Sequence, residues 1–101
     1  MFEVRIRPRA RRDLSGIWTY TRRRWSVEQA NRYLTSIHSE IARLRQNPRL
    51  GRPVQNAQAP FLKRACGKHV IFYLIDADAL DVVRVLHESM DFSTHLANDE
   101  T

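Results

Sequence analysis

Several features that define other protein classes are scarce in this chain of 101 residues. The single cysteine, Cys66, excludes an intramolecular disulfide, and although Cys66 and His69 have a spacing used by metal ligands, no second pair completes a zinc site. The longest apolar run, residues 70–75, is far too short to cross a bilayer, and the N-terminus lacks the apolar core of a signal peptide. We therefore expect a soluble, cytoplasmic protein without metal or cofactor, in which Cys66 is an ordinary buried or half-buried thiol.

Acidic residues are also scarce, and they are unevenly placed. Residues 1–24 hold eight arginines and two acids, residues 25–69 hold eight Arg or Lys and two acids, and residues 70–101 hold one arginine and seven acids. An asymmetric basic surface favours a polyanionic or acidic partner, either nucleic acid or an acidic protein segment. The alternative is that the arginines are only solvated and keep a small domain soluble.

The first half of the chain predicts one strand followed by a helical hairpin. Apolar residues alternate with charged ones over residues 2–6, which indicates a half-buried strand. The period then becomes helical over about residues 9–24, and again between Ser26, which forms a capping box with Gln29, and Asn47. We expect these apolar residues to pack on one face of a sheet: Leu14, Ile17, Trp18, Leu34, Ile37, Ile41 and Leu44.

The second half predicts a loop and three strands. Residues 47–60 hold three of the four prolines and form a loop that either packs irregularly over the core or serves as a contact surface. Strands are expected at about 61–66, 69–75 and 80–87. The chain is thus predicted to be one α+β domain of order βααβββ, a mainly antiparallel twisted sheet with the helical hairpin on one face.

The strand at 69–75 is apolar on both faces. His69, Ile71, Tyr73 and Ile75 alternate along it with Val70, Phe72 and Leu74. Two helices cover only one face of a sheet, so something else must cover the second. We favour another protein chain, and the alternative is coverage by residues 90–96 of the same chain.

The C-terminal stretch 84–96, RVLHESMDFSTHL, contains residue types common in active sites. His87 is of the residue type that most often transfers protons in active sites. A structural interpretation is nevertheless favoured, because Met90, Phe92 and Leu96 suit apolar anchoring while His87, Asp91 and His95 suit a turn or a helix cap.

A family resemblance extends over about residues 3–96. Its motifs, in chain order, are Ala10 with Asp13-Leu14, Ile17, Tyr20, Trp25, Gln29-Ala30 and Tyr33; Pro48, Gly51-Arg52 and Arg64; Gly67-Lys68-His69-Val70-Ile71-Phe72-Tyr73; and Arg84-Val85-Leu86-His87, Met90-Asp91 and His95-Leu96. In order and spacing together they resemble the ParE branch of the RelE/ParE toxins of type II toxin–antitoxin systems. The resemblance implies a compact βααβββ toxin held inactive by an antitoxin whose extended and helical C-terminal segment wraps it.

The resemblance leaves two functions in competition. RelE-like members are ribosome-dependent ribonucleases, and such a site here would use Arg64 and Arg84 for charge and His87 for proton transfer. ParE-like members are described as inhibitors of DNA gyrase that act by binding. Phe92 stands where RelE-type ribonucleases tend to present a tyrosine, and the nearby acids Glu88 and Asp91 would repel a phosphate. We therefore favour gyrase inhibition without catalysis.

The predicted contact residues fall into two groups. We expect the target to contact Arg22, Arg23, Arg24, Trp25, Arg64, His87, Glu88 and Met90. We expect the acidic segment of a ParD-like, ribbon-helix-helix antitoxin to contact Arg5, Arg64, His69, Ile71, Tyr73 and Arg84 in a toxin–antitoxin hetero-oligomer. A plain nucleic-acid-binding module is a third interpretation, but the chain has no recognition-helix or RNA-binding signature, so no direct sequence-specific binding is expected.

Overall fold

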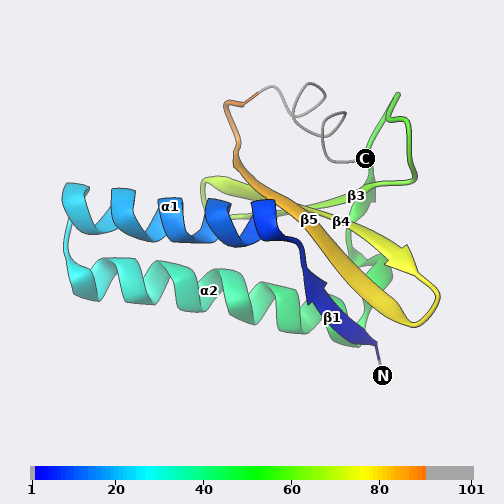
Figure 1. Cartoon of the computed structure of the whole chain (residues 1–101), viewed down its shortest axis with the longest axis horizontal. Coiled ribbons are helices and arrows are strands. Elements are labelled where there is room, and N and C mark those ends of the chain that lie inside the picture. Colours follow the sequence, from blue (N-terminus) through cyan, green and yellow to red (C-terminus); the bar gives the residue numbers. More distant parts are fainter. Residues whose placement is uncertain (1, 91–101) are drawn as a thin grey trace.

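The computed structural model describes residues 2–90, which form a helical hairpin packed against a five-stranded sheet (Figure 1). The predicted α+β class and the order βααβββ are confirmed, with one short extra strand in the loop before the final three. The elements are β1 (Glu3–Ile6), α1 (Pro8–Arg24), α2 (Val27–Gln46), the 3-10 helix η1 (Pro48–Leu50), β2 (Arg52–Pro53), β3 (Leu62–Cys66), β4 (His69–Asp76) and β5 (Ala79–His87).

Local sequence explains where the two helices begin and end. Pro8 occupies the first turn of α1, where its missing N–H breaks no helical hydrogen bond. Trp25 ends α1, and the Ser26 hydroxyl caps α2 by accepting a hydrogen bond of 3.0 Å from the Gln29 backbone N–H. The predicted end of the first helix and the predicted start of the second are therefore confirmed, and the helices form an antiparallel hairpin.

The sheet has the order β1-β5-β4-β3-β2. β1 runs parallel to β5, so the first and last strands are neighbours, whereas every other pairing is antiparallel. The unpredicted β2 is only two residues long, and Pro53 lacks the N–H needed to extend its ladder. A bulge interrupts the pairing between β4 and β5. Phe72 pairs with Arg84 but the next residue, Tyr73, pairs with Val82, so Val83 is an extra residue in β5.

The main core lies between the hairpin and the sheet. Most of the predicted helical residues, including Ile37 and Leu44, are buried there, and Leu34 is partly buried against them. Trp18 differs from its prediction. Its ring is half-buried between the helices, where the indole Nε1–H donates to Asn31 Oδ1 at 2.9 Å.

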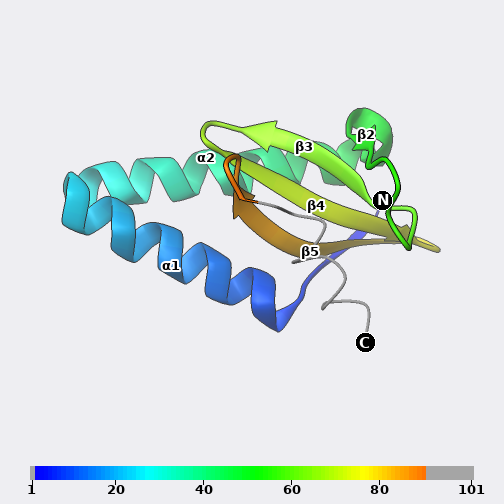
Figure 2. The ribbon, with the colours of Figure 1, turned by 90° about the horizontal axis from the view of Figure 1, so that it is seen from above.

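The hairpin projects well past the sheet in both ribbon views, so the later residues of α1 have no strand beneath them (Figures 1 and 2).

The second face of the sheet has its own smaller core. Phe61, Phe72, Val83 and Leu86 are buried there, and the loop residues Val54, Ala57 and Ala59 pack against them. Of the two alternatives for the 47–60 loop, packing over a core is the one that the structure shows. The alternative cover by residues 90–96 of the same chain falls, except for Met90, outside the described residues. Within residues 2–90 neither helix is long and apolar enough to span a membrane.

Candidate functional site

Arg84 is fixed by a carboxylate from α1. β1 ends opposite Val82, so the rest of β5 has no neighbouring strand on that side. Asp13 lies there instead and accepts a backbone hydrogen bond that a further strand would have accepted. The Asp13 carboxylate accepts hydrogen bonds from Val85 N–H at 2.9 Å, Arg84 Nε at 2.8 Å and Arg84 Nη2 at 2.9 Å. The two side chains are only 14% and 12% exposed. The predicted contact residue Arg84 therefore has a structural role as the partner of Asp13.

Arg64 is engaged in a similar way. Its Nε donates to Glu40 Oε2 on α2 at 2.7 Å, and Glu40 is largely buried. By contrast, Arg5 and Asp76 lie 3.6 Å apart with both side chains more than half exposed, a geometry that contributes little to stability. Of the three arginines predicted to meet an acidic antitoxin, only Arg5 is both exposed and loosely paired.

Two predicted antitoxin contacts point into the core. Ile71 and Tyr73 are fully buried on the helix-covered face, and Tyr73 Oη donates to Pro48 O at 2.6 Å and accepts from Gly51 N–H at 2.9 Å. The assignment of these residues to a binding face is therefore wrong, because the sequence alternation did not show which apolar face the helices cover. Val70 and Leu74 occupy the opposite face.

His69 and His87 form a cluster with Tyr33. The two histidines are directly paired across β4 and β5, and their ring centroids lie 5.3 Å apart. Tyr33 Oη lies 2.6 Å from His69 Nδ1. Burial, and secondly the neighbouring His87, lower the pKa of His69, and burial raises the pKa of Tyr33. The cluster favours a neutral His69, and no local sequence pattern indicated that Tyr33 would join it.

The tautomer of His87 follows from its neighbours. Ser89 N–H donates to His87 Nδ1 at 3.1 Å, so the neutral ring carries its proton on Nε2. A protonated Nε2 is a donor and not a metal ligand. Within the described part of the chain, no group of three or more His, Cys, Asp or Glu residues is arranged to hold a metal ion.

A groove lies between α1 and the open edge of β5, and we call it the α1–β5 groove. It has a volume of about 270 Å³ and is lined by Arg12, Asp13, Gly16, Ile17, Tyr20, Val85, Leu86, His87 and Met90. The predicted target residues His87 and Met90 meet here with Tyr20, whose exposed fraction is 68%. Sequence reasoning missed Tyr20 as a surface residue, although the spacing of 12, 16 and 20 places one helical face along the groove.

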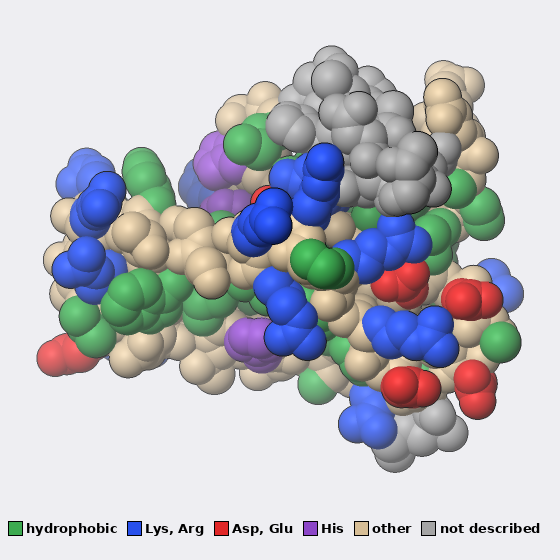
Figure 3. Space-filling model, in the orientation of Figure 1, with side chains coloured by type: hydrophobic (Ala, Val, Ile, Leu, Met, Phe, Trp, Pro, Cys, Tyr) green, Lys and Arg blue, Asp and Glu red, His purple; other side chains and the backbone are tan. Residues whose placement is uncertain are grey.

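The tip of the hairpin, residues 20–27, carries a second candidate surface. The tip exposes all four residues predicted there as target contacts: Arg22, Arg23, Arg24 and Trp25. The Arg24 guanidinium lies over the Trp25 ring at 4.9 Å. None of these arginines is in an ion pair with a carboxylate of residues 2–90. Figure 3 shows Lys and Arg side chains at the hairpin end and over α1, and most Asp and Glu side chains at the opposite end.

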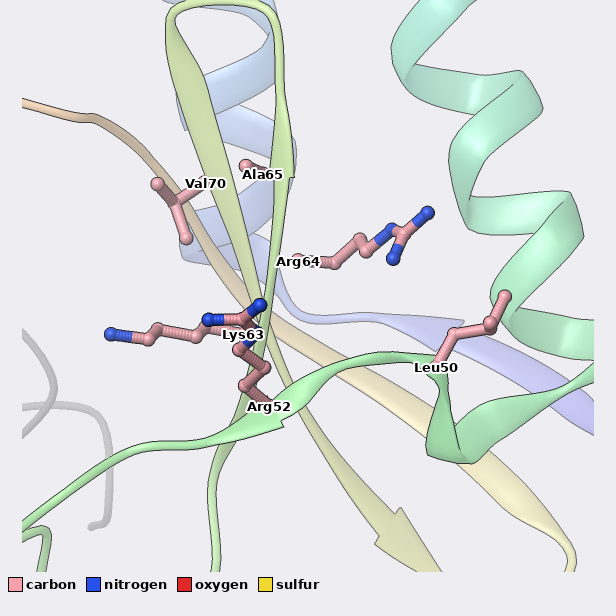
Figure 4. A pocket seen from close by; sticks show the side chains of 6 residues that line it. All are labelled: Leu50, Arg52, Lys63, Arg64, Ala65 and Val70. Carbon is pink, nitrogen blue, oxygen red and sulfur yellow. The ribbon is translucent and has the colours of Figure 1, made fainter.

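A shallow basic pocket lies on β3. It measures about 460 Å³ and is lined by Leu50, Arg52, Lys63, Arg64, Ala65 and Val70. Figure 4 shows Lys63 and Arg64 pointing to opposite sides of the strand, with Arg64 directed toward α2. The residues expected of a ribonuclease each have another partner: Arg64 contacts Glu40, Arg84 contacts Asp13, and His87 accepts a hydrogen bond from Ser89 N–H at the end of β5.

Sequence comparison agrees with this fold. Residues 4–92 match the model of a family described as the ParE toxin of the type II toxin–antitoxin system parDE. The chain belongs to the ParE toxin family. It is 39% identical to Toxin ParE1 of Caulobacter vibrioides over 96 residues, which cover 95% of this chain and 99% of that protein. It is 38% identical to Toxin ParE1 of Mycobacterium tuberculosis over 92 residues, covering 90% and 94%.

Solved structures share the ParE fold as well. The chromosomal ParDE toxin–antitoxin system from P. aeruginosa aligns with a TM-score of 0.74 at 14% identity, covering 86% of this chain and 96% of that one. The toxin–antitoxin complex RelBE2 from Mycobacterium tuberculosis aligns with a TM-score of 0.66 at 24% identity, covering 86% and 98%. This ParE chain is thus a toxin of a type II toxin–antitoxin system.

Proposed function

We propose that this ParE toxin inhibits DNA gyrase by binding to it, without chemistry of its own. The observation that carries the proposal is the contrast between its arginines. Arg64 and Arg84, which a ribonuclease would need for a phosphate, are held by Glu40 and Asp13. At Arg84, whose side chain is only 12% exposed, a phosphate would have to displace the carboxylate of Asp13. Acting on gyrase requires the toxin to be in the cytoplasm.

The hairpin tip and the α1–β5 groove are the surfaces we assign to the target. Arg22, Arg23 and Arg24 stand beside the exposed Trp25, and Arg and Trp residues often dominate binding energy at protein interfaces. His87, Glu88 and Met90 are exposed near the groove and extend this surface. Inhibition should therefore scale with the ratio of toxin to gyrase.

We further propose that a ribbon-helix-helix antitoxin of the ParD type neutralises the toxin through an acidic segment. Support comes from the net charge of +6 and from the two groups of Lys and Arg side chains that Figure 3 shows, one at the hairpin end and one near the start of α1. Charge complementarity of this kind speeds association and weakens with added salt. The affinity for the antitoxin should accordingly fall as ionic strength rises.

Messenger cleavage is the second candidate function. Two observations favour it: the basic pocket with Arg52 and Lys63 on β3, and the fold shared with the RelBE2 complex. Cleavage would need a proton-transfer group, and His87, which is exposed at the end of β5, is the residue predicted for that role.

One paired experiment separates the two functions. Purified toxin is added to gyrase in a supercoiling assay and to ribosomes carrying messenger in a cleavage assay. We expect inhibited supercoiling and intact messenger. His87→Gln should still inhibit gyrase, whereas a ribonuclease that used this imidazole would lose on the order of 10²-fold in rate or more. Cut messenger with unaffected supercoiling would replace the proposal with the ribonuclease.

The target surface is tested with matched variants. Arg23→Ala and Trp25→Ala change the hairpin tip, and Arg49→Ala removes one exposed arginine from η1 as the control. The tip variants should require a higher toxin-to-gyrase ratio for the same inhibition, and the control should not. Equal inhibition by all three variants would remove the tip from the interface.

A further inference from the structure

The hairpin tip, residues 20–27, contains three arginines and no acidic residue. Residues 5–12 hold more arginines, but acidic side chains accompany some of them, as where Arg7 donates to Asp81 at 2.8 Å. No carboxylate of residues 2–90 forms an ion pair with an arginine of the tip. The positive charge of the tip is therefore not neutralised within the described part of the protein.

Aromatic rings lie against two of these arginines. The guanidinium of Arg24 lies 4.9 Å from the centroid of the Trp25 ring, and that of Arg22 lies 5.7 Å from the Trp18 ring. A guanidinium that lies over a ring still has N–H groups around its edge to donate to oxygen acceptors. A side chain ordered in this way loses less conformational entropy when an anion binds. The rings thus prepare two arginines of the tip for an anionic partner.

The three arginines point in different directions around the end of α1. Successive side chains of an α-helix lie about 100° apart around its axis, so residues 22–24 cover more than half a turn. A flat acidic surface of another protein would meet only one side of such a helix end. The phosphates on the two sides of a groove in duplex DNA would meet all of it, since the major groove is about 12 Å wide and a helix measures about 10–12 Å across.

The hairpin can carry this charge past a protein that binds the body of the toxin. α1 has 17 residues, which gives a length of about 25 Å, and the hairpin projects beyond the sheet (Figures 1 and 2). Most Asp and Glu side chains in Figure 3 lie at the opposite end of the molecule. The field of DNA attracts the basic end and repels the acidic end. The toxin is therefore oriented with its hairpin tip toward the DNA.

We propose that the hairpin tip binds the sugar–phosphate backbone of the duplex DNA that gyrase holds, independently of base sequence. Arg22, Arg23 and Arg24 donate to phosphate oxygens, and Trp25 orders Arg24. This inference rests on the proposed inhibition of gyrase. It names DNA, and not the gyrase protein, as the molecule that the tip contacts, and it leaves the residues near the α1–β5 groove to contact the enzyme.

The test compares DNA binding with gyrase inhibition in the full-length toxin. The tip variant combines Arg23→Gln with Arg24→Gln. The control combines Arg43→Gln with Arg49→Gln, which removes the same charge from exposed positions in the last turn of α2 and in η1. Thermal unfolding checks that both are folded. Fluorescence anisotropy measures binding to short labelled duplexes of two unrelated sequences over a range of salt concentrations, and a supercoiling assay measures inhibition.

We expect wild-type toxin to bind both duplexes equally, with an affinity that falls as salt rises. The slope of log affinity against log salt should become shallower by about 2 in the tip variant, because each phosphate contact contributes about 0.9, and should stay close to the wild type in the control. The tip variant alone should need a higher ratio of toxin to gyrase for inhibition. Glu28→Gln removes the acid in the first turn of α2 beside the tip and should raise the affinity for DNA.

Equal changes of slope in the tip variant and the control would attribute DNA binding to net charge and overturn the proposal. A tip variant that binds DNA like the wild type but inhibits gyrase less would place the tip on the gyrase protein, which overturns the DNA contact and leaves the proposed function intact. Full inhibition by a tip variant that has lost DNA affinity would also overturn it. Wild-type toxin that leaves supercoiling unaffected would instead refute the proposed function, and with it the DNA of gyrase as the ligand.

Discussion

The two halves of the helical hairpin differ in what holds them. In the anchored half, Leu14, Ile17, Ile37, Ile41 and Leu44 are buried, and Asp13 binds β5 directly. In the projecting half, around residues 18–30, Ala30 is the only fully buried apolar residue, and the Trp18–Asn31 hydrogen bond joins the helices. The anchored half is therefore fixed by the sheet, whereas the projecting half exposes most of its side chains to solvent.

The arginines that contact the anchored half differ in environment from those of the projecting half. Arg84 and Arg64 are partly or largely buried and held by carboxylates of the helices, so they contribute to folding. Arg22, Arg23 and Arg24 are exposed beyond the sheet. Arginine content therefore gives little information about function until each guanidinium is placed relative to the core.

The largest expected effect comes from breaking the anchor at Asp13. Asp13→Ala leaves the buried Arg84 without its main carboxylate and Val85 N–H without an acceptor, and it should lower the free energy of unfolding by about 3–5 kcal/mol. Chemical denaturation measures this loss. Asp13→Asn keeps an acceptor oxygen and should cost less.

A double variant provides the control for the Asp13 anchor. Asp13→Leu combined with Arg84→Met removes both charges, and its destabilisation should be smaller than the sum of the single changes because no buried charge is left unpaired. Additive losses would show that the pair is not coupled.

The next effect concerns the apolar core of the anchored half. Ile37→Ala should lower the free energy of unfolding by about 2–5 kcal/mol because its side chain is fully buried against the sheet. Leu34, which is only partly buried, should cost less when changed to Ala. Equal losses at the two positions in a urea titration would contradict the burial difference described here.

A smaller effect depends on pH and on His69. Burial lowers the pKa of His69, and Tyr33, His87, Asp13 and Glu88 are the groups that interact with it. The unfolded chain, with a histidine pKa of about 6.5, then binds protons that the folded chain does not. Stability contributed by the neutral ring is thus present above that pH and lost as pH falls through the folded pKa.

The comparison of wild type with His69→Gln isolates this contribution. Denaturation at neutral and mildly acidic pH should show a steeper loss of stability in the wild type, since other titrating groups are common to both proteins. Identical pH dependence in the two proteins would mean that His69 does not contribute.

The smallest effect on stability is expected in the projecting half. Arg22→Ala, Arg23→Ala and Arg24→Ala should each change the free energy of unfolding by no more than about 0.5 kcal/mol, because these side chains are exposed and lack a carboxylate partner in residues 2–90. Thermal unfolding checks this. A large loss of Tm would show that the tip is part of the folded core and would remove its contrast with Asp13.

Local signals were sufficient to predict most of the elements. Alternation over residues 2–6, the helical period before and after Ser26, and the hairpin turn at Gly67 each depend on neighbours within a few positions. Gly67 has a φ of 61°, a conformation that glycine adopts readily. β2 was missed because two residues, one of them proline, carry no alternating pattern.

The arrangement of the candidate site depended on contacts between distant residues. Whether Ile71 or Val70 faces the helices is undetermined when both faces of a strand are apolar. The bulge at Val83 and the Asp13–Arg84 pair involve partners far apart in the chain, and so do Tyr33 and His69. The hairpin tip could be recognised from sequence as an exposed basic segment, because four adjacent residues define it.

The pairing of the first strand with the last has a consequence for synthesis. β1 and α1 are translated before the other described elements, whereas β5, which joins β1 to the rest of the sheet, is translated after all of them. Contacts between such distant segments form slowly, and incomplete chains expose apolar surface. A ribosome that stops before residue 79 releases a polypeptide without the strand that binds Asp13. Truncated products should therefore be substrates for proteases and carry no growth-inhibiting activity.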